Sequence, residues 1–200
     1  MNKFDVIKMF ETHPTTSIGV YSKRGCGKTV LCNDLINKYK TVNPEADVKC
    51  CELILGVIDY PVEYQNTHLF RRDAPKKKLF VIEHPRLRFG NNFIFDQQLA
   101  LSYKLGNHNI SRLTVDYFPC EEGYETPQYM FIVLGKCDEF NEYFFNKSSK
   151  KVYEHLKKIV SRDQLVSYIE FCTIFENLGP YEFLVIGPGG IEGTYRAELD

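Results

Sequence analysis

Short apolar runs alternate with amphipathic stretches along the chain. Ser17–Tyr21 and residues 79–82 are short, mostly apolar and β-prone, as expected of strands buried inside a sheet. The same pattern predicts strands at 48–55, 110–118, 129–134 and 181–186. Because helical segments separate several of these strands, the sequence predicts an α/β fold with a mostly parallel central sheet and helices on both faces.

The helical segments carry apolar residues three and four positions apart. This spacing predicts helices at 28–39, 95–105 and 152–160. Residues 161–164 match a capping box that begins another helix, and the Gly-Pro pair at 179–180 would end it. Residues after 186 are rich in glycine. We therefore expect 1–186 to form a single domain and 187–200 to form a loose C-terminal tail.

Composition and charge are those of an ordinary globular protein. Of the 200 residues, 44% are hydrophobic and 26% are charged, enough for one sizeable core. The formal net charge of −1 lacks the basic excess of a protein that coats nucleic acid. Basic clusters at 71–72, 76–78 and 147–158 could contact DNA phosphates, although a solvated surface is their commoner role. No run of about 18 apolar residues and no signal-peptide core occurs, so no membrane segment is expected.

The seven cysteines match neither a zinc site nor a disulfide framework. Their number is odd, no CxxC pair occurs, and Cys50 and Cys51 are neighbours. Reduced thiols are typical of the cytosol. We therefore expect a cytoplasmic protein.

The eight residues that follow the first predicted strand form a phosphate-binding motif. A P-loop requires a strand, a glycine-rich turn and Gly-Lys-Ser/Thr at the start of a helix, and all three occur here in order. Its glycines let backbone N–H groups point at phosphate oxygens, and the helix N-terminus adds the positive end of its dipole. The predicted nucleotide-binding residues are Ser22, Lys23, Arg24, Gly25, Cys26, Gly27, Lys28 and Thr29.

Individual loop positions have distinct predicted roles. Lys28, exposed at the turn, would reach the β- and γ-phosphates, and Thr29 would supply a hydroxyl to Mg²⁺. Gly27 would need to be glycine because a side chain would crowd the phosphates. Ser22 stands where the motif usually begins with glycine, and a small residue still fits there. A chance match in a turn is the alternative, but the flanking strand and helix favour nucleotide binding.

Hydrolysis also requires a carboxylate at the end of a neighbouring strand, to hold Mg²⁺ or to polarise water. Glu83 follows four apolar residues and is the better candidate, although an ordinary exposed strand end is nearly as good an interpretation. His84 stands where a catalytic-base carboxylate is usual, and Asp138 and Glu139 are better explained as a solvated loop. We expect Glu83 on a strand adjacent to the P-loop strand, within about one water of the Mg²⁺ position beside Thr29.

The order of these features resembles the poxvirus-type DNA-packaging ATPases of large nucleocytoplasmic DNA viruses, which belong to the FtsK–HerA superfamily of P-loop NTPases. The matching segments are the P-loop and its strand at 18–31, the strand that ends at Glu83, and residues 106–111, which are similar to a Gly-Arg-His-x-x-Ile-like segment of that family. The predicted strand at 181–186 is similar to the family's closing strand. The resemblance covers about residues 17–186, and only the P-loop is specific by itself.

The chain differs from this family at positions that concern catalysis. Asn107 replaces the family's arginine, and the sensor strand at 112–117 lacks the usual glutamine. In ring translocases, an arginine of a neighbouring subunit stabilises the transition state, and residues 121–128, where the family would supply it, contain none. The remaining candidates are Arg112, Arg86 and Arg88. We therefore expect the isolated protein to bind Mg-ATP and to hydrolyse it very slowly until it assembles with itself or a partner.

The resemblance implies an ATPase that couples ATP hydrolysis to packaging of viral DNA into a capsid. It implies ATP and Mg²⁺ as cofactors, Lys28 and Glu83 as catalytic residues, and Thr29 and Glu83 as metal ligands. It also implies a homo-oligomeric ring, contacts with double-stranded DNA and capsid components, and a location in host cytoplasm or the virion. Two alternatives stay open: a nucleotide-binding homologue without hydrolysis that acts in virion assembly, and a small-molecule kinase, for which no clear arginine-rich lid is visible. ATP and GTP are not distinguished, because no guanine-reading motif is evident.

Overall fold

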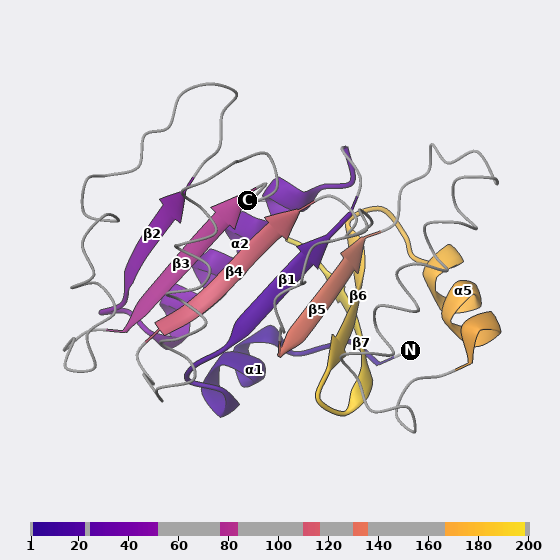
Figure 1. Cartoon of the computed structure of the whole chain (residues 1–200), viewed down its shortest axis with the longest axis horizontal. Helices are drawn as coiled ribbons and strands as arrows, with labels where there is room; N and C mark the ends of the chain where they lie inside the picture. The colour runs from indigo at the N-terminus through magenta and orange to yellow at the C-terminus, as the bar shows by residue number, and fades with distance from the viewer. Residues whose placement is uncertain are drawn as a thin grey trace, which may run out of the picture.

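The structure is a computed structural model of the chain, and it describes residues 2–22, 25–51, 77–83, 110–116, 130–135 and 167–198. Its described helices and strands end in a β-hairpin (Figure 1). The elements are α1 (Val6–Thr12), β1 (Ser17–Tyr21), α2 (Lys28–Val42), β2 (Asp47–Cys51), β3 (Lys78–Glu83), β4 (Ile110–Asp116), β5 (Phe131–Gly135), α5 (Tyr168–Glu176), β6 (Glu182–Gly187) and β7 (Gly190–Arg196).

The described strands form one seven-stranded sheet in the order β2-β3-β4-β1-β5-β6-β7. The first five strands of this order pair in parallel, and β6 and β7 pair antiparallel. The mostly parallel α/β sheet predicted from the sequence is therefore confirmed. The strand that precedes the P-loop, β1, lies between β4 and β5, and the ends of all five parallel strands point the same way (Figure 1).

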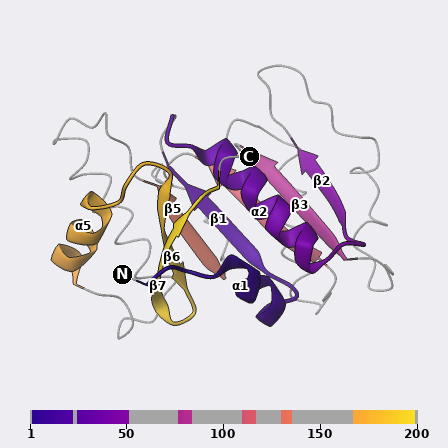
Figure 2. The same ribbon diagram turned by 180° about the vertical axis from the view of Figure 1, so that it is seen from behind.

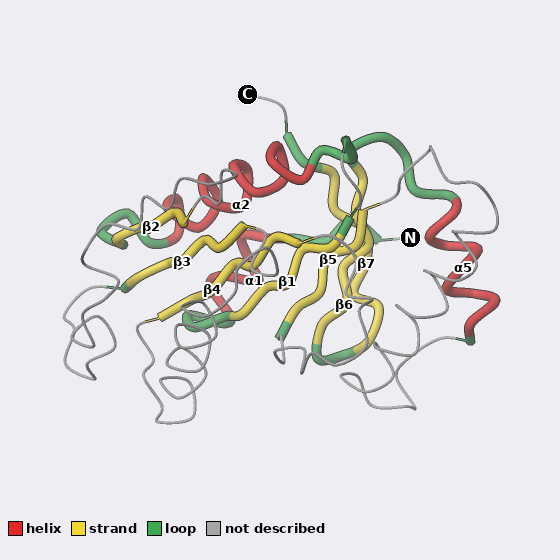
Figure 3. Tube along the Cα trace, turned by 45° about the horizontal axis from the view of Figure 1, so that its top comes forward, coloured by secondary structure: helices red, strands yellow, loops and turns green. Residues whose placement is uncertain are grey.

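Helices pack on both faces of the sheet, as predicted. Viewed from behind, α1 and α2 lie in front of the strands (Figure 2), where a buried cluster joins both helices to alternate residues of β1, β3, β4, β5 and β6. A second cluster joins Phe171 and Phe175 of α5 to residues of the opposite face, such as Ile132 and Leu184. Figure 3 shows the strands as one twisted layer with α2 running along it. Alternation along β1, β5 and β6 thus gives each of these strands residues in both clusters.

The predicted strands correspond to observed ones within a few residues. β1 matches its predicted bounds, α2 extends its prediction to Val42, and β2 begins at Asp47, with residues 52–55 outside the described part. The predicted helices at 95–105 and 152–160 and the capping box at 161–164 also lie outside it. The described helix α5 has its own capping box, in which Ser167 and Glu170 exchange side-chain and backbone bonds. No helix in the described ranges is long and apolar enough to span a membrane.

The expectation of a loose C-terminal tail was wrong. Gly190–Arg196 forms β7, which pairs antiparallel with β6. Glycines broke the alternating pattern in this segment, although Ile191, Thr194 and Tyr195 are the β-prone residues that mark it as a strand. The short helix α1 was also missed, and its sequence signal is Asp5, whose carboxylate accepts the Lys8 N–H at 3.0 Å as an N-cap.

Residues just before α1 pair with β7. The Phe4 N–H donates to the Thr194 carbonyl at 2.7 Å, and the Thr194 N–H donates to the Asn2 carbonyl at 3.0 Å. A bridge between Lys3 and Thr194 results. Gly193, with φ of 147°, leaves no room for a side chain at this contact, because an added Cβ would collide with the Asn2 carbonyl oxygen.

Candidate functional site

The predicted phosphate loop lies between β1 and α2, as the motif requires. β1 ends at Tyr21 and α2 begins at Lys28, and the structure describes every loop residue except Lys23 and Arg24. Gly25 and Gly27 have φ of 85° and 80°, in the left-handed region that glycine adopts without strain. The two glycines therefore produce a turn that residues with a Cβ would form only at a cost.

The start of α2 suits an anion. Gly27 is the N-cap and offers no side-chain acceptor, and the first turn contains no acidic residue. The first intrahelical bond runs from the Leu31 N–H to the Gly27 carbonyl at 2.9 Å. The N–H groups that precede it in the first turn have no intrahelical acceptor, and they add to the positive end of the helix dipole. This is the arrangement by which helix N-termini bind phosphate.

Lys28 is buried, and the expectation that it is exposed was wrong. Its side chain folds back over the loop, so that Nζ donates to the Ser22 carbonyl oxygen at 3.0 Å, and only 8% of the residue is exposed. Ser22 is fully buried. The ammonium therefore lies across the start of the loop, where it adds a full positive charge to the partial charge of the helix end.

The serine at the first motif position is explained by its neighbour on β5. Tyr21 is opposite Leu134, so Ser22 comes next to Gly135. A Cβ added to Gly135 would lie 2.9 Å from the Ser22 Cβ and 2.7 Å from Cε1 of Phe183. Glycine at 135 makes the space that a serine at the head of the loop needs.

Position 27 requires glycine for reasons besides the crowding of phosphates that the sequence predicts. Besides its positive φ, it lies under the ring of Tyr181, since an added Cβ would be 2.5 Å from Cδ1 and 2.9 Å from Cε1 of that ring. Sequence reasoning missed Tyr181, which lies 154 positions later in the numbering and precedes β6. The available signal was an aromatic residue directly after Gly179-Pro180, which does not identify its partner.

Glu83 does not lie on the strand adjacent to β1, contrary to the expectation. β4 lies between β1 and β3, so that Val20 is opposite Val115, which in turn is opposite Glu83. The backbone of Glu83 still lies at the end of the sheet where the loop begins. The residue beside the loop on the adjacent strand is Asp116, opposite Tyr21. Asp116 was not among the predicted site residues. His84, Asp138 and Glu139 lie outside the described residues.

Arg112 cannot serve as the arginine that reaches a neighbouring subunit. It lies within β4 and is 3% exposed, and its Nε donates to Thr114 Oγ1 at 2.8 Å. A guanidinium enclosed in this way is unable to extend beyond its own sheet. The other two candidates, Arg86 and Arg88, lie outside the described residues.

Thr29 is exposed at the first turn of α2, which leaves its side chain accessible at the loop. Within the described ranges, no three His, Cys, Asp or Glu side chains form a metal-binding group. In a P-loop, Mg²⁺ is bound by one hydroxyl, phosphate oxygens, waters and one or two carboxylates. Among the described residues, Cys26, Cys32 and Cys172 are not joined in disulfides.

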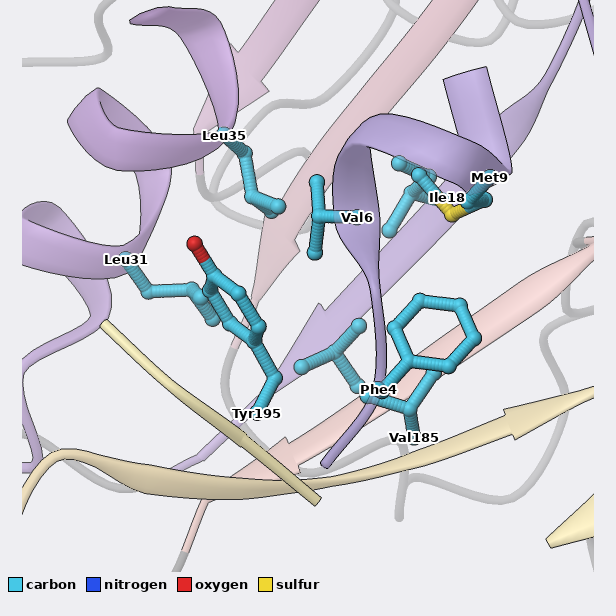
Figure 4. Close-up of a pocket in the computed structure, with 9 residues that line it drawn as sticks. Phe4, Val6, Met9, Ile18, Leu31, Leu35, Val185 and Tyr195 are labelled. Carbon is cyan, nitrogen blue, oxygen red and sulfur yellow. The ribbon is translucent and has the colours of Figure 1, made fainter. Parts of the chain in front are cut away.

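The pocket in Figure 4 is a gap in the core. Apolar side chains of α1, α2 and the sheet line it, among them Val6, Met9, Leu31 and Leu35. The polar atom that reaches it is the hydroxyl of Tyr195, which is already bonded to Asp34. A lining of this kind does not suit a nucleotide, so the phosphate loop remains the candidate site.

Two solved structures share this fold over nearly the whole chain. The genome packaging NTPase B204 from Sulfolobus turreted icosahedral virus 2, in complex with sulfate, matches with a TM-score of 0.58 and 9% identity over 94% of this chain and 98% of that chain. Its complex with AMP matches with a TM-score of 0.53 and 10% identity over 93% and 99%. No protein-family model and no curated protein sequence matches this chain. At these identities, the likeness establishes the α/β fold.

Proposed function

We propose that this protein is a P-loop ATPase of the viral DNA-packaging class. The observation that carries the proposal is the loop itself, with two left-handed glycines, an N-terminal helix turn without an acidic residue, and the Lys28 ammonium over the loop. Two further points support it: the similar fold belongs to a genome packaging NTPase that binds sulfate and AMP, and the motif order resembles packaging ATPases.

Nucleotide binding would use the first turn of α2 and Lys28. Backbone N–H groups of the turn would donate to phosphate oxygens, and Lys28 Nζ would exchange the Ser22 carbonyl for oxygens of the β- and γ-phosphates. The ammonium is charged in both arrangements, but the phosphate oxygens are anionic whereas the Ser22 carbonyl is neutral, so the new bonds join two opposite charges. The exchange is therefore favourable even though it breaks a 3.0 Å bond within the loop. Lys23, Arg24 and Cys26 would complete the loop around the phosphates.

Hydrolysis would take place where the parallel strands end. Thr29 and Glu83 would hold Mg²⁺, which when bound neutralises charge on the β- and γ-phosphates. Glu83 would also orient a water for in-line attack on the γ-phosphorus, with ADP as the leaving group. Asp116, on the strand adjacent to β1, is a second carboxylate that could take either role.

DNA packaging would require assembly into a ring that surrounds double-stranded DNA and contacts capsid components. Because Arg112 is buried within its own sheet, any arginine that completes the site must come from another segment or another subunit. This strengthens the expectation of very slow hydrolysis by the isolated chain. The same observation favours one alternative, a nucleotide-binding assembly component without hydrolysis.

The first test is calorimetric binding of Mg-ATP to the whole chain and to Lys28→Met, which keeps the aliphatic stem. We expect the wild type to bind and the variant to lose at least about tenfold in affinity, since charge-assisted bonds to phosphate disappear. Equal affinity in a folded variant would reject the P-loop proposal. ATP turnover measured with and without double-stranded DNA then separates packaging ATPase from binding component: DNA-stimulated turnover supports the first, and none supports the second.

A further inference from the structure

Tyr181 is an aromatic residue beside the phosphate loop that is open to solvent. It directly precedes β6, which runs antiparallel to β5 and pairs Phe183 with Gly135, the last residue of β5. β6 therefore begins at the end of the sheet where β1 and β5 end. At this end of the sheet, the ring of Tyr181 lies over Gly27 of the phosphate loop.

The position of this ring is fixed by an unfavourable backbone conformation. Tyr181 has φ of 56°, and it is the one non-glycine residue with positive φ in the described ranges. The turn around it is well bonded, because Glu182 Oε2 accepts the Gly179 N–H at 2.8 Å and the Glu182 N–H donates to the Gly179 carbonyl at 3.2 Å. The Tyr181 carbonyl also accepts the Ala197 N–H at 3.0 Å. Left-handed backbone at a residue with a large side chain persists only where its surroundings over-determine it, and such residues cluster at ligand sites.

The ring also remains accessible. Tyr181 is 40% exposed, one of only three large hydrophobic residues in the described ranges to be exposed at this level. The part of the side chain that stays open to solvent is available to another group. An aromatic side chain held rigidly beside a phosphate loop and open to solvent is suited to contact the flat part of a ligand whose phosphates the loop binds.

We propose that Tyr181 stacks against the base of the nucleotide bound by the P-loop. This inference rests on the proposed nucleotide binding and adds a residue that neither the motif nor the fold comparison assigns. Base–aromatic stacking is tolerant of base identity because every base presents a π-face. The contact therefore adds affinity for nucleoside triphosphates in general and does not distinguish ATP from GTP.

The test separates the base from the phosphates. Mg²⁺ complexes of ATP, GTP and inorganic tripolyphosphate are titrated calorimetrically into the whole chain and into Tyr181→Asn and Tyr181→Phe. Asparagine removes the ring and tolerates the left-handed backbone better than alanine does. Phenylalanine keeps the ring. Thermal unfolding of each variant verifies that the turn is intact.

We expect Tyr181→Asn to weaken ATP and GTP alike by about 5- to 150-fold, the range for one base–aromatic stack, and to leave tripolyphosphate affinity unchanged. Tyr181→Phe should bind all three ligands as the wild type does. Three results for Tyr181→Asn would each overturn the inference. If tripolyphosphate affinity falls as much as ATP affinity, the ring supports the loop, and if tripolyphosphate affinity rises, the ring obstructs the phosphates. If ATP affinity is unchanged, the ring does not contact the base. Wild-type protein that binds neither ATP nor tripolyphosphate would reject the proposed function itself, whereas Lys28→Met should weaken all three ligands.

Discussion

Asp34, in the middle of α2, accepts a hydrogen bond from the hydroxyl of Tyr195 on β7, although the two residues are 161 positions apart. The same carboxylate oxygen accepts the Glu198 N–H at 3.1 Å, and Asp34 is 6% exposed. Burial, together with the neighbouring Asp34 carboxylate, raises the pKa of Tyr195 well above its ordinary value, so the hydroxyl keeps its proton and remains a donor. The helix that begins at the phosphate loop is thus joined to the C-terminal hairpin.

Replacing Asp34 by alanine should destabilise the fold by roughly 2–4 kcal/mol, because two hydrogen bonds to a buried, charged acceptor are lost, one from Tyr195 and one from the Glu198 backbone. Lys38→Ala is the matched control on the same helix. It removes an ion pair with Glu198 whose side chains are 26% and 68% exposed, and such pairs contribute about 0–1 kcal/mol. Urea unfolding monitored by circular dichroism measures both. Similar losses from the two substitutions would contradict the structural role of Asp34.

Lys28→Met should lower stability as well as nucleotide affinity. Its Nζ bond to the buried Ser22 carbonyl is lost, and the loss of a buried hydrogen bond to a charged group costs roughly 1–3 kcal/mol. For a chain of this size that cost corresponds to a fall of about 2–12 °C in melting temperature, measurable by differential scanning fluorimetry. Thr29→Ala, at an exposed position of the same turn, should change the melting temperature far less. An unchanged melting temperature for Lys28→Met would show that the bond is not formed in solution.

Gly25 and Gly27 form a pair that isolates the contact with Tyr181. Both have left-handed backbone, so an alanine at either position costs about 1–2 kcal/mol. Nothing lies within 4 Å of a Cβ at Gly25, whereas one at Gly27 would meet the Tyr181 ring at 2.5 Å. Gly27→Ala should therefore be the more destabilising change in chemical denaturation, and adding Tyr181→Asn should remove most of the difference. If Gly25→Ala is equally harmful, the ring does not lie on Gly27.

The turn that carries Tyr181 should weaken in acid. The Gly179 N–H bond to the Glu182 carboxylate holds the pKa of Glu182 below its ordinary value of 4.5. Because the folded-state pKa is lowered, the contribution is complete above the unfolded value and is lost as pH falls through the folded one. Between about pH 5 and 3, Glu182→Gln should lose less stability than the wild type does. Glu11→Gln, at an exposed position of α1, is the control for loss of one charge and should follow the wild-type profile.

Local features were predictable from the sequence, and long-range ones were not. The strand, turn and helix of the P-loop follow from a short apolar run, two glycines and a helical apolar face, all within about 25 residues. The order of strands depends on pairing between distant segments, and for this reason Glu83 was assigned to the wrong neighbour. Tyr181 was missed for the same reason. The burial of Lys28 depends on a side-chain conformation that residue type does not specify.

The pairing of residues 2–4 with β7 also has a consequence for contacts between molecules. An outermost strand exposes unpaired N–H and C=O groups to which another chain can add, and this is a common route to aggregation. Here both backbone groups of Thr194 are paired: its carbonyl accepts the Phe4 N–H, and its N–H donates to the Asn2 carbonyl. Any side chain at Gly193 would displace Asn2 and free them. That glycine therefore leaves room for the pairing at Thr194, which protects this point of the edge from strand addition by another chain.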